Sequence, residues 1–171
     1  MQLRETPVTS EPAVRLLTEY FTSRELDFPT NQGVYRVTFP PPEQFVPPVG
    51  VFLVVETGEG DAGGEGDAAA DTVGHAVGCG GIRRIADGPT GARYEVKHVF
   101  IEPAARGQGL AAALMAELEA RAAAFGAAEV VLDTNASLEA AARLYARLGY
   151  HSIAAYNTNT NATNWYAKTL G

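Results

Sequence analysis

The sequence predicts an α/β fold in which helices pack on a mixed β-sheet. Short β-branched runs such as residues 51–56 predict strands, and longer stretches with apolar residues at helical spacing predict helices. Strands and helices alternate along the chain, which is typical of α/β proteins. The chain has 171 residues, of which 46% are hydrophobic, so we expect one domain over residues 1–171.

The N-terminal part is expected to hold a helix and a loop. Apolar residues repeat at helical spacing over residues 10–25, where Ser10 is in position to cap the helix. The proline-rich residues 29–50 are too irregular for a long element. They predict a loop with one helical turn at residues 42–45.

Two strands joined by an acidic connection come next, at residues 51–56 and 75–85. Residues 57–72 between them contain five acidic residues and no basic ones, and nothing there could anchor a core, so we expect a flexible hairpin tip. The whole chain has a net charge of -7, which leaves only -2 for the rest of it. A nearly neutral body gives no support for binding to nucleic acid or to an anionic membrane.

The C-terminal half alternates strands with helices. Leu110, Leu114 and Leu118 form the apolar stripe of one helix, and a second helix is expected to be capped by Ser137 and ended by Gly149. In order, we expect a strand at 92–101, a helix within 104–125, a strand at 128–133, a helix at 137–149, and strands at 151–156 and 164–170.

Cysteine usage and the N-terminus bear on the location of the protein. Cys79 is the only cysteine, so no disulfide can form within the chain, which fits a reducing compartment. The N-terminus lacks the apolar region of a signal peptide, and no apolar run is long enough to span a bilayer. We therefore expect a soluble cytoplasmic protein with Cys79 as a small buried side chain.

The stretch ARGQGLAA places two glycines at the mouth of a good helix, although glycine weakens helices. The first turn of a helix has free N–H groups and the positive end of the helix dipole. Gly107 and Gly109 would let a phosphate approach the backbone, Ala111 and Ala112 keep the turn slim, and Arg106 adds a positive charge. The stretch predicts a site for a phosphate-bearing cofactor.

Three phosphate-binding motifs can be compared with this stretch. A P-loop requires GxxxxGK[ST], and no lysine follows here. The dinucleotide fingerprint GxGxxG/A is matched by Gly107, Gly109 and Ala112, and Asp133 ends the next strand. However, residues 102–106 separate the match from its strand, and the chain lacks further βαβ units. A nicotinamide-dependent oxidoreductase therefore fits less well.

The third motif fits best. Residues 106–111 match Q/R-x-x-G-x-G/A, and the chain resembles the GNAT acetyltransferase superfamily, in which this motif binds the pyrophosphate of acyl-CoA. Residues 132–153 are similar to the family's second motif, where an asparagine precedes a helix that carries a tyrosine and ends in Gly-aromatic. The resemblance covers residues 94–153. It implies a mixed, mostly antiparallel, twisted sheet with helices on both faces and splayed strands at the acyl-CoA site.

The same resemblance implies acetyl-CoA as cosubstrate. Backbone N–H groups of residues 108–112 would hold its pyrophosphate, and the end of the preceding strand would pair with the pantetheine arm. This arm would enter a splay between strands 95–101 and 129–133, near the Asn135 side chain. The residues implied in binding are Val99, Phe100, Ile101, Arg106, Gly107, Gln108, Gly109, Leu110, Ala111, Ala112, Asn135 and Tyr145.

Acetyl transfer to an amine is helped by a proton donor for the departing thiolate. Tyr145 occupies the family's tyrosine position in L-Y-x-x-x-G-Y, and a phenol with a reference pKa of about 10 is protonated at neutral pH. Because Tyr145 shares a helix face with Leu138, Ala141 and Leu148, a role in the core is the alternative. We interpret Tyr145 as the donor.

The attacking amine must lose a proton, and Glu95 is the predicted base. Its place in the strand resembles that of the base in some histone-directed family members, and partial burial would raise its pKa. A salt bridge with Lys97, Arg83 or Arg84 is the alternative, and a water chain could take the place of the base. Strand alternation would place Glu95, Lys97, Val99 and Ile101 on one side and Val96, His98 and Phe100 on the other.

We expect an N-acetyltransferase that passes the acetyl group directly to a small-molecule amine. Candidate acceptors are an amino acid, a polyamine, an aminoglycoside-like amine or a xenobiotic. The alternatives are a protein or peptide amine as acceptor, and an acyl-CoA-binding module without catalysis. His75, His98 and His151 lack partners at metal-ligand spacing, so no metal is expected. Edge strands near the C-terminus are compatible with a homodimer.

Overall fold

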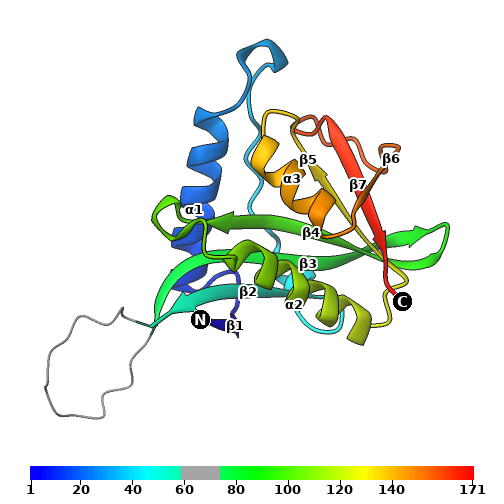
Figure 1. Ribbon diagram of the computed structural model, residues 1–171, viewed down its shortest axis with the longest axis horizontal. Helices are drawn as coiled ribbons and strands as arrows, with labels where there is room; N and C mark the ends of the chain where they lie inside the picture. The colour runs from blue at the N-terminus through cyan, green and yellow to red at the C-terminus, as the bar shows by residue number, and fades with distance from the viewer. Residues whose placement is uncertain (59–73) are drawn as a thin grey trace, which may run out of the picture.

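Figure 1 shows the computed structural model, which describes residues 1–58 and 74–171. The predicted acidic tip lies outside the described residues except for Thr57 and Gly58. None of the helices in the described ranges is both long and apolar enough to cross a membrane. The elements are β1 (Gln2–Glu5), α1 (Glu11–Leu26), the 3-10 turns η1 (Thr30–Gln32) and η2 (Pro42–Phe45), β2 (Gly50–Thr57), β3 (His75–Gly88), β4 (Gly91–Ile101), the 3-10 turn η3 (Pro103–Ala105), α2 (Leu110–Ala124), β5 (Glu129–Thr134), α3 (Glu139–Arg147), β6 (His151–Ile153) and β7 (Asn164–Thr169).

The strands form one mixed sheet in the order β1-β2-β3-β4-β5-β7-β6. Every neighbouring pair is antiparallel except β4 and β5, which are parallel. Their backbone register runs from Arg93↔Glu129 to Glu95↔Val131 and stops there, although both strands continue. The predicted mixed, mostly antiparallel sheet with two splayed strands is confirmed.

Helices cover both faces of this sheet, as predicted (Figure 1). On one face α1 buries Leu16, Leu17 and Phe21 against side chains of β2, β3 and β4. On the other face the predicted stripe of α2 is buried, and α3 packs beside it on the same core. The two faces follow the period-2 alternation of β2, where Leu53 belongs to one core and Phe52 to the other.

A β-bulge in β4 overturns the predicted alternation of its side chains. The register passes from Gly81↔Lys97 to Cys79↔Phe100, so two residues of β4 lie opposite one residue of β3. His98 in the bulge has a φ of 57°. Val96 and Phe100, expected on one face, therefore lie in the cores of opposite faces.

Some element boundaries also differ from the predictions, since β3 extends to Gly88 instead of residue 85 and β6 ends at Ile153 instead of residue 156. Helix α2 begins at Leu110, because Gly107 and Gly109 both adopt positive φ and cannot continue a helix backward. Helix α3 is preceded by Leu138 at its N-cap, so the prediction of Ser137 as the cap was wrong. The Ser137 N–H instead donates to Oδ1 of Asn135, which closes a turn before the helix.

The strand β1 was not predicted. Its sequence QLRE contains one apolar residue, Leu3, and therefore shows no alternation. It pairs with β2 at the edge of the sheet, where a half-exposed strand needs little apolar surface.

Candidate functional site

The turn between η3 and α2, where the sequence predicts an anion site, leaves its two glycines open to solvent. Gly107 and Gly109 have φ values of 82° and 78°, and no atom lies within 4 Å of the point that a Cβ would occupy on either. Residues 106–109 are exposed, and the first bond into the helix is donated by the Ala113 N–H to the Gly109 carbonyl. The N–H groups of residues 110–112, in the first turn, precede that bond and can face a ligand.

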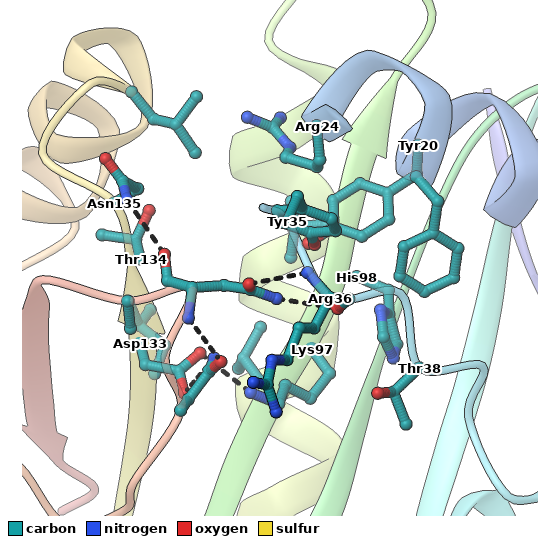
Figure 2. A pocket seen from close by; sticks show the side chains of 18 of the residues that line it. Tyr20, Arg24, Tyr35, Arg36, Thr38, Lys97, His98, Asp133, Thr134 and Asn135 are labelled. Carbon is teal, nitrogen blue, oxygen red and sulfur yellow. Dashed lines mark hydrogen bonds and ion pairs between the residues drawn. The ribbon is translucent and has the colours of Figure 1, made fainter. Parts of the chain in front are cut away.

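A cavity of about 410 Å³ lies where β4 and β5 diverge. Its walls come from the C-terminal half of α1, the loop after it, the two splayed strands, the start of α3 and the loop between β6 and β7. Figure 2 shows Tyr20, Arg24 and His98 on one side and Asp133, Thr134 and Asn135 on the other. The divergence of the strands thus opens a space between segments that are far apart in the sequence.

Three of the predicted site residues line this cavity, namely Val99, Asn135 and Tyr145. The other predicted residues do not. They are Glu95, Phe100, Ile101, Arg106, Gly107, Gln108, Gly109, Leu110, Ala111 and Ala112. The predicted residues therefore fall mainly into two places, the cavity and the turn at the N-terminus of α2, whereas Glu95, Phe100 and Ile101 lie in β4 outside both.

Tyr145 is 8% exposed and packs against the rings of Tyr150 and Tyr166, with centroids 5.9 Å and 6.2 Å away. Burial raises the pKa of its phenol above the ordinary value, and the nearby Tyr20 acts in the same direction. The phenol is therefore protonated at neutral pH and has a proton to donate. The ring belongs to the core and the side chain also lines the cavity, while the donor role stays a prediction.

The Asn135 side chain connects three segments around the cavity. Its amide nitrogen donates to Gln32 Oε1 at 2.7 Å and to the Asn161 carbonyl at 3.0 Å, while its oxygen accepts from the Ser137 N–H. The residue is buried. These contacts fix the positions of the loops that form the cavity walls.

Glu95 is 2% exposed, and its carboxylate is surrounded by donors. Arg83 lies at 2.7 Å and Lys97 at 3.2 Å, and the Tyr156 hydroxyl donates to it at 2.9 Å. The salt-bridge alternative is therefore present in the structure, with Arg83 and Lys97, whereas Arg84 pairs with Asp87. The role of Glu95 as a base stays a prediction.

Several cavity residues were missed as site residues by the sequence analysis. His98 was considered only as a metal ligand, and its Nδ1 is buried in the cavity wall without a hydrogen-bond partner among the described residues. Burial lowers its pKa from 6.5 to about 3, with the positive Lys97 and Arg83 adding to the effect. Tyr20 and Arg24 lie in the predicted helix at residues 10–25, but neither they nor Arg36 carried a motif that could have identified them.

Comparison with protein families identifies the class. The family model described as Acetyltransferase (GNAT) family matches residues 31–150, which is more than half of the chain. The chain therefore belongs to the GNAT acetyltransferase family, and the resemblance found in the sequence is confirmed. The general class of reaction is therefore acyl transfer from an acyl-CoA cosubstrate.

Solved structures share the fold across almost the whole chain. An acetyltransferase of the GNAT family from Staphylococcus aureus Mu50 matches with a TM-score of 0.71 and 13% identity, covering 99% of each chain. A chain of the NatC complex, bound to Gag peptide and CoA, matches with a TM-score of 0.64 and 16% identity over 100% of both chains. FeeM, an N-acyl amino acid synthase from uncultured soil microbes, has a TM-score of 0.63 and 16% identity, covering 99% of this chain and 95% of its own. No curated protein matches the sequence.

Proposed function

We propose that this protein transfers the acetyl group of acetyl-CoA directly to a primary amine of a small molecule. The observation that carries the proposal is the cavity at the divergence of β4 and β5, into which both Tyr145 and the bulged end of β4 face. The amine nitrogen attacks the thioester carbonyl carbon, the C–S bond breaks, and the amine loses a proton. No covalent enzyme intermediate is required, because Cys79 is fully buried on the α1 side of the sheet.

Acetyl-CoA is proposed to bind at both places described above. Its pyrophosphate would accept hydrogen bonds from the N–H groups of residues 108–112, with Arg106 close by. Support comes from the exposed turn and the positive φ of its glycines. The pantetheine arm would pair with the main chain of residues 99–101, which has no registered partner in β5.

Tyr145 is proposed to donate the proton to the departing CoA thiolate. Its raised pKa keeps the phenol protonated, and its position in the cavity wall gives it access to a ligand. Asn135 is proposed to contact the cofactor near its pantetheine. Since its amide already has protein partners, its larger contribution would be to hold the surrounding loops.

Glu95 or a water chain is proposed to receive the amine proton. Replacement of Glu95 by Gln separates these cases. If Glu95 is the base, kcat/KM of the unmodified protein rises with pH and the variant shows a flatter rise. Because Arg83, Lys97 and Tyr156 already contact the carboxylate, we expect the variant to keep the rise of kcat/KM with pH and to be less stable than the unmodified protein. That result would make water the base and Glu95 a positioning residue.

Calorimetry and a thiol-release assay test the function together. We expect heat of binding with acetyl-CoA and none with NAD, and release of free CoA thiol that depends on an added amine. Binding without release for any amine or peptide would indicate an acyl-CoA-binding module. Binding of NAD alone would favour the oxidoreductase, and release with peptides alone would move the acceptor to a protein or peptide amine.

A further inference from the structure

We infer that the amine acceptor carries a carboxylate and an apolar side group, and that Arg24 and Arg36 bind the carboxylate. The inference rests on the proposed function and names the substrate class of the same cavity. Three features support it: the charges that remain unpaired in the lining, the position of the two arginines, and the aromatic character of the wall.

The cavity lining has an excess of positive charge. Its basic residues are Arg24, Arg36, Arg83 and Lys97, and its acidic residues are Asp27 and Asp133. Two of the basic side chains are already neutralised, since Arg83 pairs with Glu95 at 2.7 Å and Lys97 pairs with Asp133 at 2.8 Å. Within residues 1–58 and 74–171, Arg24 and Arg36 form no ion pair, so these two remain for a ligand.

Arg24 is held in place but not satisfied. Its guanidinium lies over the Tyr20 ring, 5.3 Å from the centroid, and its Nε is buried without a hydrogen-bond partner in the described chain. A buried donor without a partner is costly unless a ligand supplies an acceptor. A carboxylate is the group that a guanidinium binds best, through two parallel hydrogen bonds.

Arg36 is fixed through its backbone. Its N–H donates to Asn161 Oδ1 at 2.9 Å, and its carbonyl accepts from Asn161 Nδ2 at 2.8 Å. Figure 2 shows its side chain extending into the space between Lys97 and the Asn135 side of the cavity. Because the residue is exposed and also lines the cavity, it lies at the mouth, where an anionic group of an entering ligand would meet it.

The same charges disfavour polycationic acceptors. A polyamine or an aminoglycoside-like amine brings extra ammonium groups, which need free carboxylates. Asp133 is engaged by Lys97, Asn157 and Asn159, and only the exposed Asp27 remains. An extra ammonium group would therefore face unpaired arginines rather than acids, which costs free energy in a partly desolvated site.

Aromatic side chains supply the apolar part of the wall. Phe21, Phe28, Tyr35 and Phe39 line the cavity together with the neutral His98. Phe39 is 48% exposed although its ring lies 5.0 Å from that of Phe21. An apolar group of the acceptor would cover this surface. An apolar or aromatic amino acid combines the amine, the carboxylate and the side group in one molecule.

Matched acceptors test the inference. Phenylalanine is compared with phenylalaninamide and 2-phenylethylamine, and leucine with leucinamide and 3-methylbutylamine, by amine-dependent release of CoA thiol. We expect kcat/KM for each amino acid to exceed that of its two analogues by about tenfold or more, the size of a lost charge-assisted hydrogen bond. Equal or faster acetylation of the analogues would overturn the inference and leave the proposed function intact.

Variants locate the effect. Arg24→Gln and Arg36→Gln are expected to raise the KM for phenylalanine about tenfold or more. The KM for 2-phenylethylamine, which has no carboxylate, should stay the same. The control is Arg84→Gln, which removes the same charge from an exposed residue paired with Asp87 outside the cavity. Arg24→Lys keeps the positive charge but cannot form two parallel hydrogen bonds with a carboxylate. It is the second variant at this position in case Arg24→Gln does not fold.

Binding measurements distinguish a failure of this inference from a failure of the proposed function. Calorimetric titration of phenylalanine into the protein saturated with CoA should give heat that both Gln variants diminish, and titration of acetyl-CoA should be unaffected by them. Loss of acetyl-CoA affinity in the variants would mean that the arginines bind the cofactor, and the inference would be wrong. Absence of phenylalanine and leucine binding would also overturn it. Absence of acetyl-CoA binding to the unmodified protein would overturn the proposed function.

Discussion

Lys97 Nζ lies 2.8 Å from Asp133 Oδ1, and this ion pair joins β4 to β5 two residues beyond their last backbone pair, Glu95↔Val131. The two side chains are only 17% and 6% exposed. Burial disfavours the charge on both. Glu95 and Asp133 together outweigh it and raise the pKa of Lys97, whereas Lys97, Asn157 and Asn159 together lower the pKa of Asp133. The ion pair therefore replaces the backbone ladder at the point where the cavity begins.

Removal of Lys97 should be costly. Lys97→Met leaves Asp133 and Glu95 without this cation, and we expect the free energy of unfolding to fall by about 3 kcal/mol in urea titrations. Acetyl transfer should also slow, because the strands proposed to hold the cofactor lose their connection. The control Lys168→Met breaks a pair with Glu119 that joins β7 to α2 outside the cavity, and it should leave transfer unchanged. A stable Lys97→Met variant with normal activity would contradict this role.

His98 should make stability depend on pH. The unfolded chain takes up a proton near pH 6.5, whereas the folded protein keeps this ring neutral down to about pH 3. The unfolded state therefore binds more protons between these values, so stability is full above pH 6.5 and falls on acidification by up to about 1.4 kcal/mol per pH unit.

The test of this pH effect is His98→Asn, since asparagine tolerates the positive φ of the bulge. The variant should show a flatter stability curve between pH 4 and 6.5 in denaturant titrations. The same substitution at the exposed His151 serves as control. A curve as steep as that of the unmodified protein would exclude His98 as the cause.

Tyr145→Phe should separate chemistry from binding. Removal of the phenol proton is expected to lower the single-turnover rate of transfer by about 100-fold, a typical contribution of a general acid. Calorimetric affinity for acetyl-CoA should change little. Tyr166→Phe is the control, since that ring packs against Tyr145 but does not line the cavity. Equal rates for both variants would remove Tyr145 from the mechanism.

The two ends of α2 offer a matched pair of glycines. Gly109 before the helix and Gly126 after it have φ values of 78° and 86°, and both have open space where a Cβ would project. Alanine at either position should cost about 1 kcal/mol of stability through backbone strain. Only Gly109→Ala should also weaken acetyl-CoA binding, because its Cβ would stand where the pyrophosphate approaches. Equal affinities in calorimetry would contradict the proposed anion site.

The sequence predicted what depends on local spacing. The stripe of Leu110, Leu114 and Leu118 identified α2, and the glycines before it indicated a turn with room for a ligand at the backbone. The bulge was not predictable, because His98 is a non-glycine residue in a left-handed conformation that the surrounding sheet imposes. Because the bulge was not predicted, Phe100 was placed on the wrong face of the sheet.

The cavity was hidden for a different reason. Its two sides come from Tyr20 and Arg24 on α1 and from Asn135 at the end of β5, more than a hundred residues later. The loops that complete it are irregular and carry no periodic signal. Motifs could therefore indicate the turn proposed for the cofactor, whereas the side of the cavity proposed for the acceptor is formed only in the folded chain.

The parallel ladder between β4 and β5 is the short connection between two parts of the sheet. One half-sheet, β1 to β4, and the other, β5-β7-β6, share three registered backbone pairs in the described chain. A cofactor inserted at their divergence would touch both halves and act as a wedge. Binding of the cofactor should then slow amide hydrogen exchange at the facing edges of β4 and β5, because it reduces the local motion of both strands.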